Sequence, residues 1–322
     1  MTAMKALRFA HYGPPSVLSL LECEIPQPGP GESLVQVEAA AINPSDVKNV
    51  AGAFKAPLPR TPGRDYAGIV VAGEGKGREV WGSGPAFGAE RDGSHAQFVL
   101  LRVDWLADKP ARLTMEQAAA IGVPFLVAWN GLIDEGRVQA GETVLVTGAG
   151  GAVGRAVTQI ARWKGARVIG ADIANRSSVA DVFINTREKD LMSEVHAVTG
   201  GRGADLAYDA VGGPMFEPCL RSLALGGRQL AITSIGDRRV SFDLLDFYHN
   251  RLHLIGVDSM QLGGCEIARI FDALRPGFDS GQLKPFEVQS SALDRAVEAY
   301  AAVEKGGGSA RHVLLPQTRE MM

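Results

Sequence analysis

The 322-residue sequence has few cysteines and no apolar run long enough to span a bilayer. Its three cysteines, Cys23, Cys219 and Cys265, are far apart and lack the spacing of a metal-binding cluster. They are typical of free thiols in a reducing compartment, so neither disulfides nor a zinc cluster is expected. The longest apolar run, residues 118–129, is interrupted by a glycine and a proline and is too short for a transmembrane helix.

Strong charge of one sign is also missing. The net charge is −3, and no long block of like charge occurs, so we expect neither a nucleic-acid partner nor a membrane partner. The first ten residues lack the apolar core of a secretory signal peptide, which favours a cytoplasmic protein. The length suffices for about two domains with full cores.

What the sequence does contain is a glycine-rich turn between an apolar strand and a helix. Residues 144–146 form a β-branched and apolar run of the kind found in strands buried on both faces. Apolar residues at helical spacing follow over residues 153–161, and a second strand is expected over residues 167–171. The glycines between the first strand and the helix are Gly148, Gly150, Gly151 and Gly154.

This order of strand, turn, helix and strand predicts a dinucleotide site. Free N–H groups at a helix start attract a pyrophosphate, and glycine allows the backbone to approach it closely. Asp172 follows the second strand, where a carboxylate can accept hydrogen bonds from the adenosine ribose. A nucleoside-triphosphatase loop would need Lys followed by Ser or Thr, and the chain has Arg155 and Ala156 after the last glycine.

The chain divides into a β-rich part and an alternating part. Short strands separated by Pro- and Gly-rich turns are expected at Lys5–Ala10, Val17–Cys23, Leu34–Ala39, Tyr66–Ala72, Arg78–Trp81 and Ala96–Leu101. Thr114 and Gln117 form a capping-box pattern at the start of a helix that leads into the second domain. We therefore expect one domain over residues 1–120 and 263–322, and a second over residues 121–262.

Within the second domain, strands alternate with helices, as in a parallel sheet covered on both faces. One of the predicted helices covers Pro214–Leu225. The tail carries two further predicted helices, Cys265–Leu274 and Ala292–Glu304, and an apolar strand at residues 313–315. Such a tail is too small to fold alone, so we expect it to complete the first domain.

Five motifs together give the chain a family resemblance. They are residues 42–46 (INPSD), 62–68 (PGRDYAG), 141–154 (GETVLVTGAGGAVG), 199–205 (TGGRGAD) and 209–213 (DAVGG). With these motifs in this order, the chain resembles the medium-chain dehydrogenase/reductase superfamily, in its zinc-independent quinone oxidoreductase branch. The resemblance implies an α/β fold, with a Rossmann doubly wound parallel sheet and a β-rich GroES-like substrate domain. It also implies a homodimer.

The resemblance implies NAD(P)H-dependent transfer of hydride to a quinone or to an activated α,β-unsaturated carbonyl compound. Zinc-dependent relatives place Cys and His where this chain has Asn43 and Arg64, so no metal site is expected and a zinc-dependent alcohol dehydrogenase is disfavoured. A catalytically weak NAD(P)H-binding sensor or scaffold of the same fold stays open. Its motivation is that Lys48 and Phe54 stand where many quinone reductases have tyrosines.

Three residues are candidates for catalysis by this resemblance. Asn43 corresponds to a residue beside the nicotinamide, and its amide can donate to a developing oxyanion, although a local structural role is weighed equally. Ser45 stands where zinc-dependent relatives carry a proton-relay hydroxyl, and an ordinary turn residue is the competing interpretation. Lys48 can donate to an enolate, but a solvated lysine is the more common case. His95 is expected to be structural.

The choice between NADP and NAD stays open. Asp172 favours NAD, because a carboxylate repels a 2′-phosphate. Arg176 and Ser177 follow within reach, and the branch more often uses NADPH. The predicted cofactor-binding residues are Gly148, Gly150, Gly151, Ala152, Val153, Gly154, Asp172, Arg176, Ser177, Val211, Ser234 and Arg311.

Overall fold

The chain folds into two compact units in a computed structural model that describes residues 3–174, 179–306 and 308–317. Unit 1 comprises Met1–Val123 and Met260–Met322, and unit 2 comprises Pro124–Ser259. The predicted domain borders lie three residues before the first of these borders and three residues after the second. Arg176 and Ser177, two of the predicted cofactor-binding residues, lie outside the described residues.

Unit 1 contains a seven-stranded sheet and a separate two-stranded ribbon, as the β-rich composition of this part predicts. The sheet has the strand order β14-β15-β3-β4-β5-β7, with β6 also pairing with β3. Its strands are β3 (Glu32–Ala41), β4 (Asp65–Gly73), β5 (Glu79–Ser83), β6 (Phe98–Arg102), β7 (Ala107–Asp108), β14 (Val288–Ala292) and β15 (Arg311–Leu315). The ribbon pairs β1 (Ala3–Arg8) with β2 (Ser19–Glu24).

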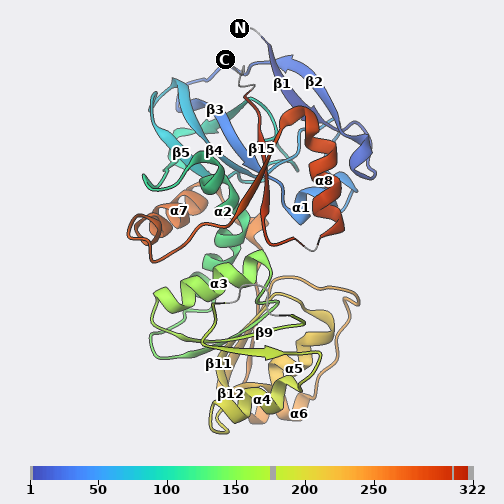
Figure 1. Ribbon diagram of the computed structural model, residues 1–322, viewed down its shortest axis with the longest axis vertical. Coiled ribbons are helices and arrows are strands. Elements are labelled where there is room, and N and C mark those ends of the chain that lie inside the picture. The colour runs from blue at the N-terminus through green and yellow to red at the C-terminus, as the bar shows by residue number, and fades with distance from the viewer. Residues whose placement is uncertain (1–2, 175–178, 307, 318–322) are drawn as a thin grey trace. The chain divides into compact units, whose positions relative to one another are not determined.

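The C-terminal segment returns to unit 1 and becomes part of this sheet. Strand β15 pairs antiparallel with β3, so that Val313 lies opposite Ala41 and Leu314 opposite Ala40. Figure 1 shows the red C-terminal strand beside the blue strand β3. Residues that are distant in sequence are therefore held next to each other near Ala41, where β3 leads into the first helix.

The helices of unit 1 cover this sheet. They are α1 (Pro44–Val50), the first part of α2 (Met115–Trp129), α7 (Gly264–Asp279) and α8 (Ala296–Lys305), with single 3-10 turns at Pro15–Val17, Val103–Trp105, Ser259–Gln261 and Leu293–Arg295. Val47 of α1, Tyr300 of α8 and Leu314 of β15 belong to one buried apolar cluster. The predicted capping box is present, because the Thr114 N–H donates to the Gln117 side chain and the Gln117 N–H to the Thr114 hydroxyl.

Helix α2 is kinked at Gly122, whose backbone dihedrals are not helical. A Cβ atom at this position would clash with the carboxyl group of Asp65. That carboxyl group accepts the Val123 N–H, with both oxygens at 2.9 Å. A side chain inserted into the helical ladder is a recognised cause of kinking, and Pro124 adds to it by lacking an N–H.

Unit 2 is a doubly wound domain with a six-stranded, fully parallel sheet, which confirms the predicted Rossmann architecture. The strand order is β10-β9-β8-β11-β12-β13. The strands are β8 (Thr143–Thr147), β9 (Arg167–Asp172), β10 (Val182–Asn185), β11 (Ala204–Asp209), β12 (Leu223–Ala231) and β13 (His253–Gly256). The order reverses beside β8, and ligands of such sheets bind at the carboxyl end of the strands near this reversal.

Helices cover both faces of the sheet (Figure 1). They are α3 (Ala152–Trp163), α4 (Leu191–Val198), α5 (Phe216–Arg221) and α6 (Leu244–His249), with a π-helical segment at Asn130–Glu135 and a 3-10 turn at Gly213–Met215. Leu145 and Ala207 pack with Val195 of α4 and Leu220 of α5. Alternate residues of a strand point to opposite faces, so continuous apolar strands such as β8 serve both helical layers.

Two predicted helices are shorter than expected. The pattern over Pro214–Leu225 is a 3-10 turn followed by α5, and residues 223–225 already belong to strand β12. The pattern over Ala292–Glu304 begins with the end of β14, and α8 starts only at Ala296. At residues 223–225 and at Ala292, strand pairing overrides a helical apolar pattern, because helix propensity is a weak preference that tertiary structure can override. Residues 293–295 form a 3-10 turn before α8. Helix α8 ends at Gly306, which has a φ of +66°.

No helix in the described part of the chain is both long enough and apolar enough to cross a membrane.

Candidate functional site

The glycine turn of unit 2 has the backbone geometry that the sequence predicts. Gly148 follows β8 with a φ of +62°, in the left-handed region that favours glycine. A Cβ atom on Gly154 would clash with the carbonyl oxygen of Gly148 and with Ala149. The turn and the first turn of α3 therefore touch each other through bare backbone, which only glycine at position 154 permits.

The start of α3 presents N–H groups without a side-chain cap. Gly151 is the N-cap residue and has no side chain that could accept them. The next three N–H groups, those of Ala152, Val153 and Gly154, precede the first intrahelical hydrogen bond, which runs from the Arg155 N–H to the Gly151 carbonyl oxygen at 2.9 Å. Uncapped N–H groups and the positive end of the helix dipole suit a pyrophosphate, so the residues present fit a dinucleotide.

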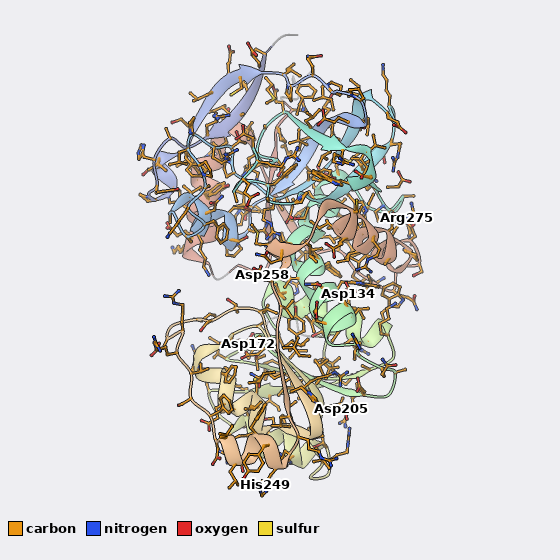
Figure 2. The ribbon with its side chains drawn as sticks, turned by 180° about the vertical axis from the view of Figure 1, so that it is seen from behind. Asp134, Asp172, Asp205, His249, Asp258 and Arg275 are labelled. Atoms are coloured by element: carbon orange, nitrogen blue, oxygen red, sulfur yellow. The ribbon has the colours of Figure 1, made fainter. Side chains whose placement is uncertain are left out.

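Asp172 lies at the carboxyl end of β9 and closes the turn from one side. One of its carboxylate oxygens accepts the Gly150 N–H at 2.9 Å, and the other accepts the Ile173 N–H at 2.7 Å. Figure 2 shows Asp172 and Asp205 at opposite ends of the sheet in unit 2. Asp172 is the last residue of β9, whereas Asp205 lies near the start of the parallel strand β11. The carboxylate of Asp172 is thus fixed beside the glycine turn while retaining lone pairs for a further donor.

Val211 and Ser234 lie on the loops that follow β11 and β12, at the same end of the sheet. A Cβ atom on Gly148 would lie 3.3 Å from a methyl carbon of Val211. The Val211 carbonyl oxygen accepts the Ile235 N–H at 2.8 Å, which ties the two loops together. The structure therefore brings Val211 next to the glycine turn and Ser234 into the neighbouring loop.

A buried pair that sequence reasoning missed holds these loops to the sheet. The Thr147 hydroxyl donates to the Asp209 carboxylate at 2.6 Å, and the same oxygen accepts the N–H groups of Val211 and Gly212 at 3.1 and 2.9 Å. Asp209 is fully buried. The available signal was that Thr147 and Asp209 are the last residues of adjacent parallel strands, which places their side chains together.

In unit 1, Asn43 is the centre of a buried polar network. It precedes α1, and its backbone N–H donates to Asp46 at 2.8 Å. Its side-chain nitrogen donates to Asp65 at 2.8 Å, and its side-chain oxygen accepts from the Arg311 guanidinium at 2.6 Å. An amide nitrogen carries two protons, and the hydrogen bond to Asp65 uses one of them. The Asn43 side chain also forms a hydrogen bond that lowers the pKa of Asp46, so both carboxylates act on this amide.

Burial shifts the ionisation of both acids in this network. Desolvation raises the pKa of Asp46 to about 6, against the opposing effects of the Asn43 N–H and of the positive charges of Arg64 and Arg311. Desolvation also raises the pKa of Asp65, against the hydrogen bonds from Asn43 and Val123. These acids and Arg64 were not among the predicted site residues. The Asn-x-x-Asp spacing at the start of α1 was the signal for the Asn43–Asp46 contact.

The other two predicted catalytic residues differ in their environment. Ser45 lies in the first turn of α1, is half-buried, and has a hydroxyl oxygen that is buried without a hydrogen-bond partner. Lys48 lies in the last turn of α1 and is exposed. Phe54, one of the two positions without the expected tyrosine, is also exposed. Of the three candidates, Asn43 alone is held by a network of side chains.

His95 is structural in its surroundings, as expected. The imidazole is fully buried, with Nε2 at 3.1 Å from the Ala41 carbonyl oxygen and Nδ1 at 2.7 Å from the Tyr300 hydroxyl. A carbonyl oxygen only accepts, so Nε2 carries the proton and Nδ1 accepts from Tyr300. Desolvation lowers the pKa of His95 to about 4, so the ring is neutral at physiological pH.

Comparison with protein families matches both units. The model of the alcohol dehydrogenase GroES-like domain matches residues 29–111, and that of the zinc-binding dehydrogenase domain matches residues 152–272. Among the described residues, no group of three or more His, Cys, Asp and Glu side chains is placed to hold a metal ion.

Individual proteins match over almost the whole chain. A zinc-type alcohol dehydrogenase-like protein of Schizosaccharomyces pombe is 35% identical over 309 residues, which cover 92% of this chain and 93% of that protein. A quinone oxidoreductase of Pongo abelii is 30% identical, with 97% of each chain covered. The structure of a mycobacterial protein in complex with NADPH superposes with a TM-score of 0.84 at 27% identity, covering 97% of this chain and all of that one.

Proposed function

Since the chain belongs to the medium-chain dehydrogenase/reductase superfamily, in its quinone oxidoreductase branch, and is an NAD(P)H-dependent oxidoreductase, we propose that it reduces a quinone or an activated α,β-unsaturated carbonyl compound without zinc. The observation that carries the proposal is that the chain contains both an uncapped glycine turn, in unit 2, and a buried amide network, in unit 1. The first suits a dinucleotide, and the second offers a polar hydrogen without a metal ligand set.

The cofactor side of the proposal rests on the turn after β8. The N–H groups of Ala152, Val153 and Gly154 bind the pyrophosphate, and Asp172 accepts hydrogen bonds from the ribose hydroxyls. The bound nicotinamide supplies the hydride. Because the Asp172 carboxylate is fixed beside the turn, we propose a preference for NADH over NADPH. A 2′-phosphate would meet like charge there.

The acceptor side of the proposal rests on Asn43. Addition of a hydride to a quinone or enone leaves negative charge on a carbonyl oxygen, and a preorganised donor lowers the energy of that charge. Asp65 and Arg311 fix the carboxamide by its nitrogen and its oxygen, so the direction of its N–H bonds is defined before an acceptor binds. Ser45 and Lys48 stay predicted donors, with Ser45 supported by its unpartnered hydroxyl.

The absence of zinc from the mechanism is supported by the donor chemistry at two positions. Asn43 has its side-chain oxygen engaged by Arg311, and Arg64 carries a cation that would repel a metal ion. Amide and guanidinium groups do not replace the thiolate and imidazole ligands of a tetrahedral zinc site. Elemental analysis of the purified protein tests this part, and zinc in a one-to-one ratio with the chain would contradict it.

The reaction is tested by stopped-flow measurement of the decrease in NADH and NADPH absorbance. The panel of acceptors contains 1,4-benzoquinone, 2-cyclohexen-1-one and an enoyl thioester. We expect turnover with at least one acceptor and none with a saturated ketone, which lacks the activated double bond. The variant Gly154→Val serves as a control, because its side chain would occupy the close contact with Gly148. Equal turnover by this variant would contradict the assigned nucleotide site.

The alternative function is a nucleotide-binding sensor or scaffold with weak catalysis. The exposed Lys48 and Phe54, which replace the tyrosines of many quinone reductases, favour it. It predicts tight binding of NADH or NADPH in calorimetry without turnover of any acceptor.

A homodimer and a cytoplasmic location stay predictions from the sequence. Light scattering of the purified protein tests the first.

A further inference from the structure

Arg64 is a buried cation without a hydrogen-bond acceptor. Only 4% of its surface is exposed, and its Nε atom is buried without a partner. Within the described part of the chain, its guanidinium takes part in no hydrogen bond and no ion pair. Buried arginines normally donate to acceptors, because buried N–H groups without hydrogen bonds are costly. A fold that retains such a group is expected to use it.

The backbone holds Arg64 in place. It lies directly before β4, and its carbonyl oxygen accepts the Gly84 N–H at 2.8 Å. The preceding Gly63 has a φ of +99°, and a Cβ atom there would clash with the His95 ring. The start of the Arg64 side chain is therefore fixed by a glycine that the buried histidine requires.

The nearby carboxylates are committed to other donors. Asp65 accepts the Val123 N–H and the Asn43 amide, and Asp46 accepts the Asn43 N–H. Arg64 acts on both acids through its charge, lowering the pKa of each, but not through a hydrogen bond. The guanidinium is thus close enough to balance charge, while its N–H groups stay uncommitted.

Further uncommitted polar atoms occur on the same segments. The hydroxyl oxygen of Ser83 and the amide oxygen of Asn49 are buried without partners, as is the hydroxyl of Ser45. Ser83 lies opposite Asp65 in the register of β4 and β5, one residue from Arg64. Asn49 and Gly63 both lie next to Gly88. A Cβ atom placed on Gly88 would be 3.3 Å from the Asn49 side-chain nitrogen and 3.3 Å from the Gly63 backbone nitrogen. The hydroxyl groups of Ser45 and Ser83 and the guanidinium of Arg64, all in unit 1, are therefore donors that could serve an anion.

We propose that Arg64 binds an oxyanion of the hydride acceptor, and that the preferred acceptors carry a carboxylate. Guanidinium groups bind carboxylates in a planar, two-point geometry that a neutral acceptor does not match. The proposal rests on the proposed function for its catalytic part. Reduction of such an acceptor adds a hydride from NAD(P)H and a proton from water across the carbon–carbon double bond, giving the saturated acid and NAD(P)⁺.

The test compares an acid with its ester. The probes are trans-4-oxopent-2-enoate and its methyl ester, which differ in the carboxylate alone. The variants are Arg64→Met, which keeps the apolar stem, Arg64→Lys, which keeps the charge, and Arg78→Met as a control from a half-buried ion pair with Asp108. Binding of both probes to the full chain is measured by calorimetry with NAD⁺ and, separately, with NADP⁺, and kcat/KM is measured with NADH and with NADPH.

For Arg64→Met we expect the affinity for the acid and kcat/KM for the acid to fall roughly 10- to 100-fold, the range of hydrogen bonds to charged groups. The values for the ester should change less than about threefold, and Arg64→Lys should be intermediate. Arg78→Met should leave all values unchanged. If Arg64→Met does not fold, Arg64→Lys alone tests the proposal. It should weaken binding of the acid and leave binding of the ester nearly unchanged.

Three results would overturn the proposal. The wild-type protein could fail to prefer the acid over the ester, or Arg64→Met and Arg64→Lys could weaken both probes equally. A third contrary result is weaker NADPH binding with unchanged binding of the acid, which would assign Arg64 to the cofactor. Loss of turnover with every acceptor while Arg64-dependent binding of the acid persists would instead contradict the proposed reaction and support the anion site.

Discussion

The Arg311 guanidinium donates to the side-chain oxygen of Asn43 at 2.6 Å, although the two residues are 268 positions apart in the sequence. The contact exists because β15 pairs with β3 and places the start of the C-terminal strand beside the residue that precedes α1. Arg311 was predicted as a cofactor-binding residue. In the structure it is mostly buried and orients Asn43, so any contact of Arg311 with the cofactor stays a prediction.

We predict that Asn43→Ala lowers the free energy of unfolding by about 2–4 kcal/mol, because it leaves Arg311 and one oxygen of Asp65 with fewer partners in a buried site. Urea unfolding measures this. The double variant Asn43→Ala, Arg311→Met should be less destabilised than the sum of the single variants by roughly 1–3 kcal/mol. Additive effects would show that the two side chains act independently.

The second prediction concerns the glycine turn. Gly154→Ala should weaken the binding of NADH and NADPH at least tenfold and reduce stability, because its Cβ clashes with the Gly148 carbonyl oxygen. Gly256→Ala is the matched control in the same sheet, since a Cβ atom there meets nothing within 4 Å. Titration of nucleotide fluorescence gives both dissociation constants. Equal binding by the two variants would argue against the turn as the pyrophosphate site.

The third prediction concerns Asp172 and the choice of cofactor. Asp172→Asn keeps a hydrogen-bond acceptor for the Gly150 N–H but removes the charge. The ratio of kcat/KM for NADPH to that for NADH should rise roughly fivefold to tenfold, as expected for one charge at short range in a solvated site. Asp205→Asn, at the opposite end of the sheet, should leave the ratio unchanged. An unchanged ratio in Asp172→Asn would remove the basis for the NADH preference.

Local patterns in the sequence predicted the strands, glycine turn and helix of unit 2, and nucleotide binding at that turn stays a prediction. The positions of Gly148, Gly154 and Asp172 follow from one continuous stretch, because a strand, a tight turn and a helix are specified by neighbouring residues. The capping box at Thr114 is equally local and was found. By contrast, the end of α5 and the start of α8 were misplaced. Residues 223–225 and Ala292 belong to strands, which are decided by sheet neighbours, and residues 293–295 form a 3-10 turn.

The polar network in unit 1 was not predictable in the same way. Asn43, Asp65 and Arg311 come from three separate segments, and only the pairing of β15 with β3 joins the last to the others. The burial of Arg64 has no sequence signal either, since a charged residue before a strand normally lies at the surface. The family resemblance pointed to Asn43 and Arg311. It did not predict that these two side chains are hydrogen-bonded to each other, or that Asn43 donates to Asp65.

The fourth prediction concerns pH and His95. The folded protein holds the imidazole neutral, with its pKa lowered by burial to about 4, while the unfolded chain has a pKa near 6.5. The unfolded state therefore binds more protons between these values, and stability falls as pH decreases from 6.5 towards 4. The difference corresponds to about 3 kcal/mol. Asp46 has the opposite effect, because its pKa of about 6 means that the folded state loses stability as pH rises towards that value.

The two effects overlap, so the contribution of His95 has to be isolated by substitution. His95→Gln keeps a donor for the Ala41 carbonyl oxygen but cannot be protonated. Between pH 4.5 and 6, a range that lies inside the titration window, the free energy of unfolding should rise with pH more steeply in the wild type than in His95→Gln, by up to about 1.4 kcal/mol per pH unit. Tyr300→Phe, which removes the donor to Nδ1 and keeps the ring, should lower stability while preserving much of the wild-type slope. Parallel curves for the wild type and His95→Gln would mean that the imidazole is not held neutral and that another group sets the acid limit of stability.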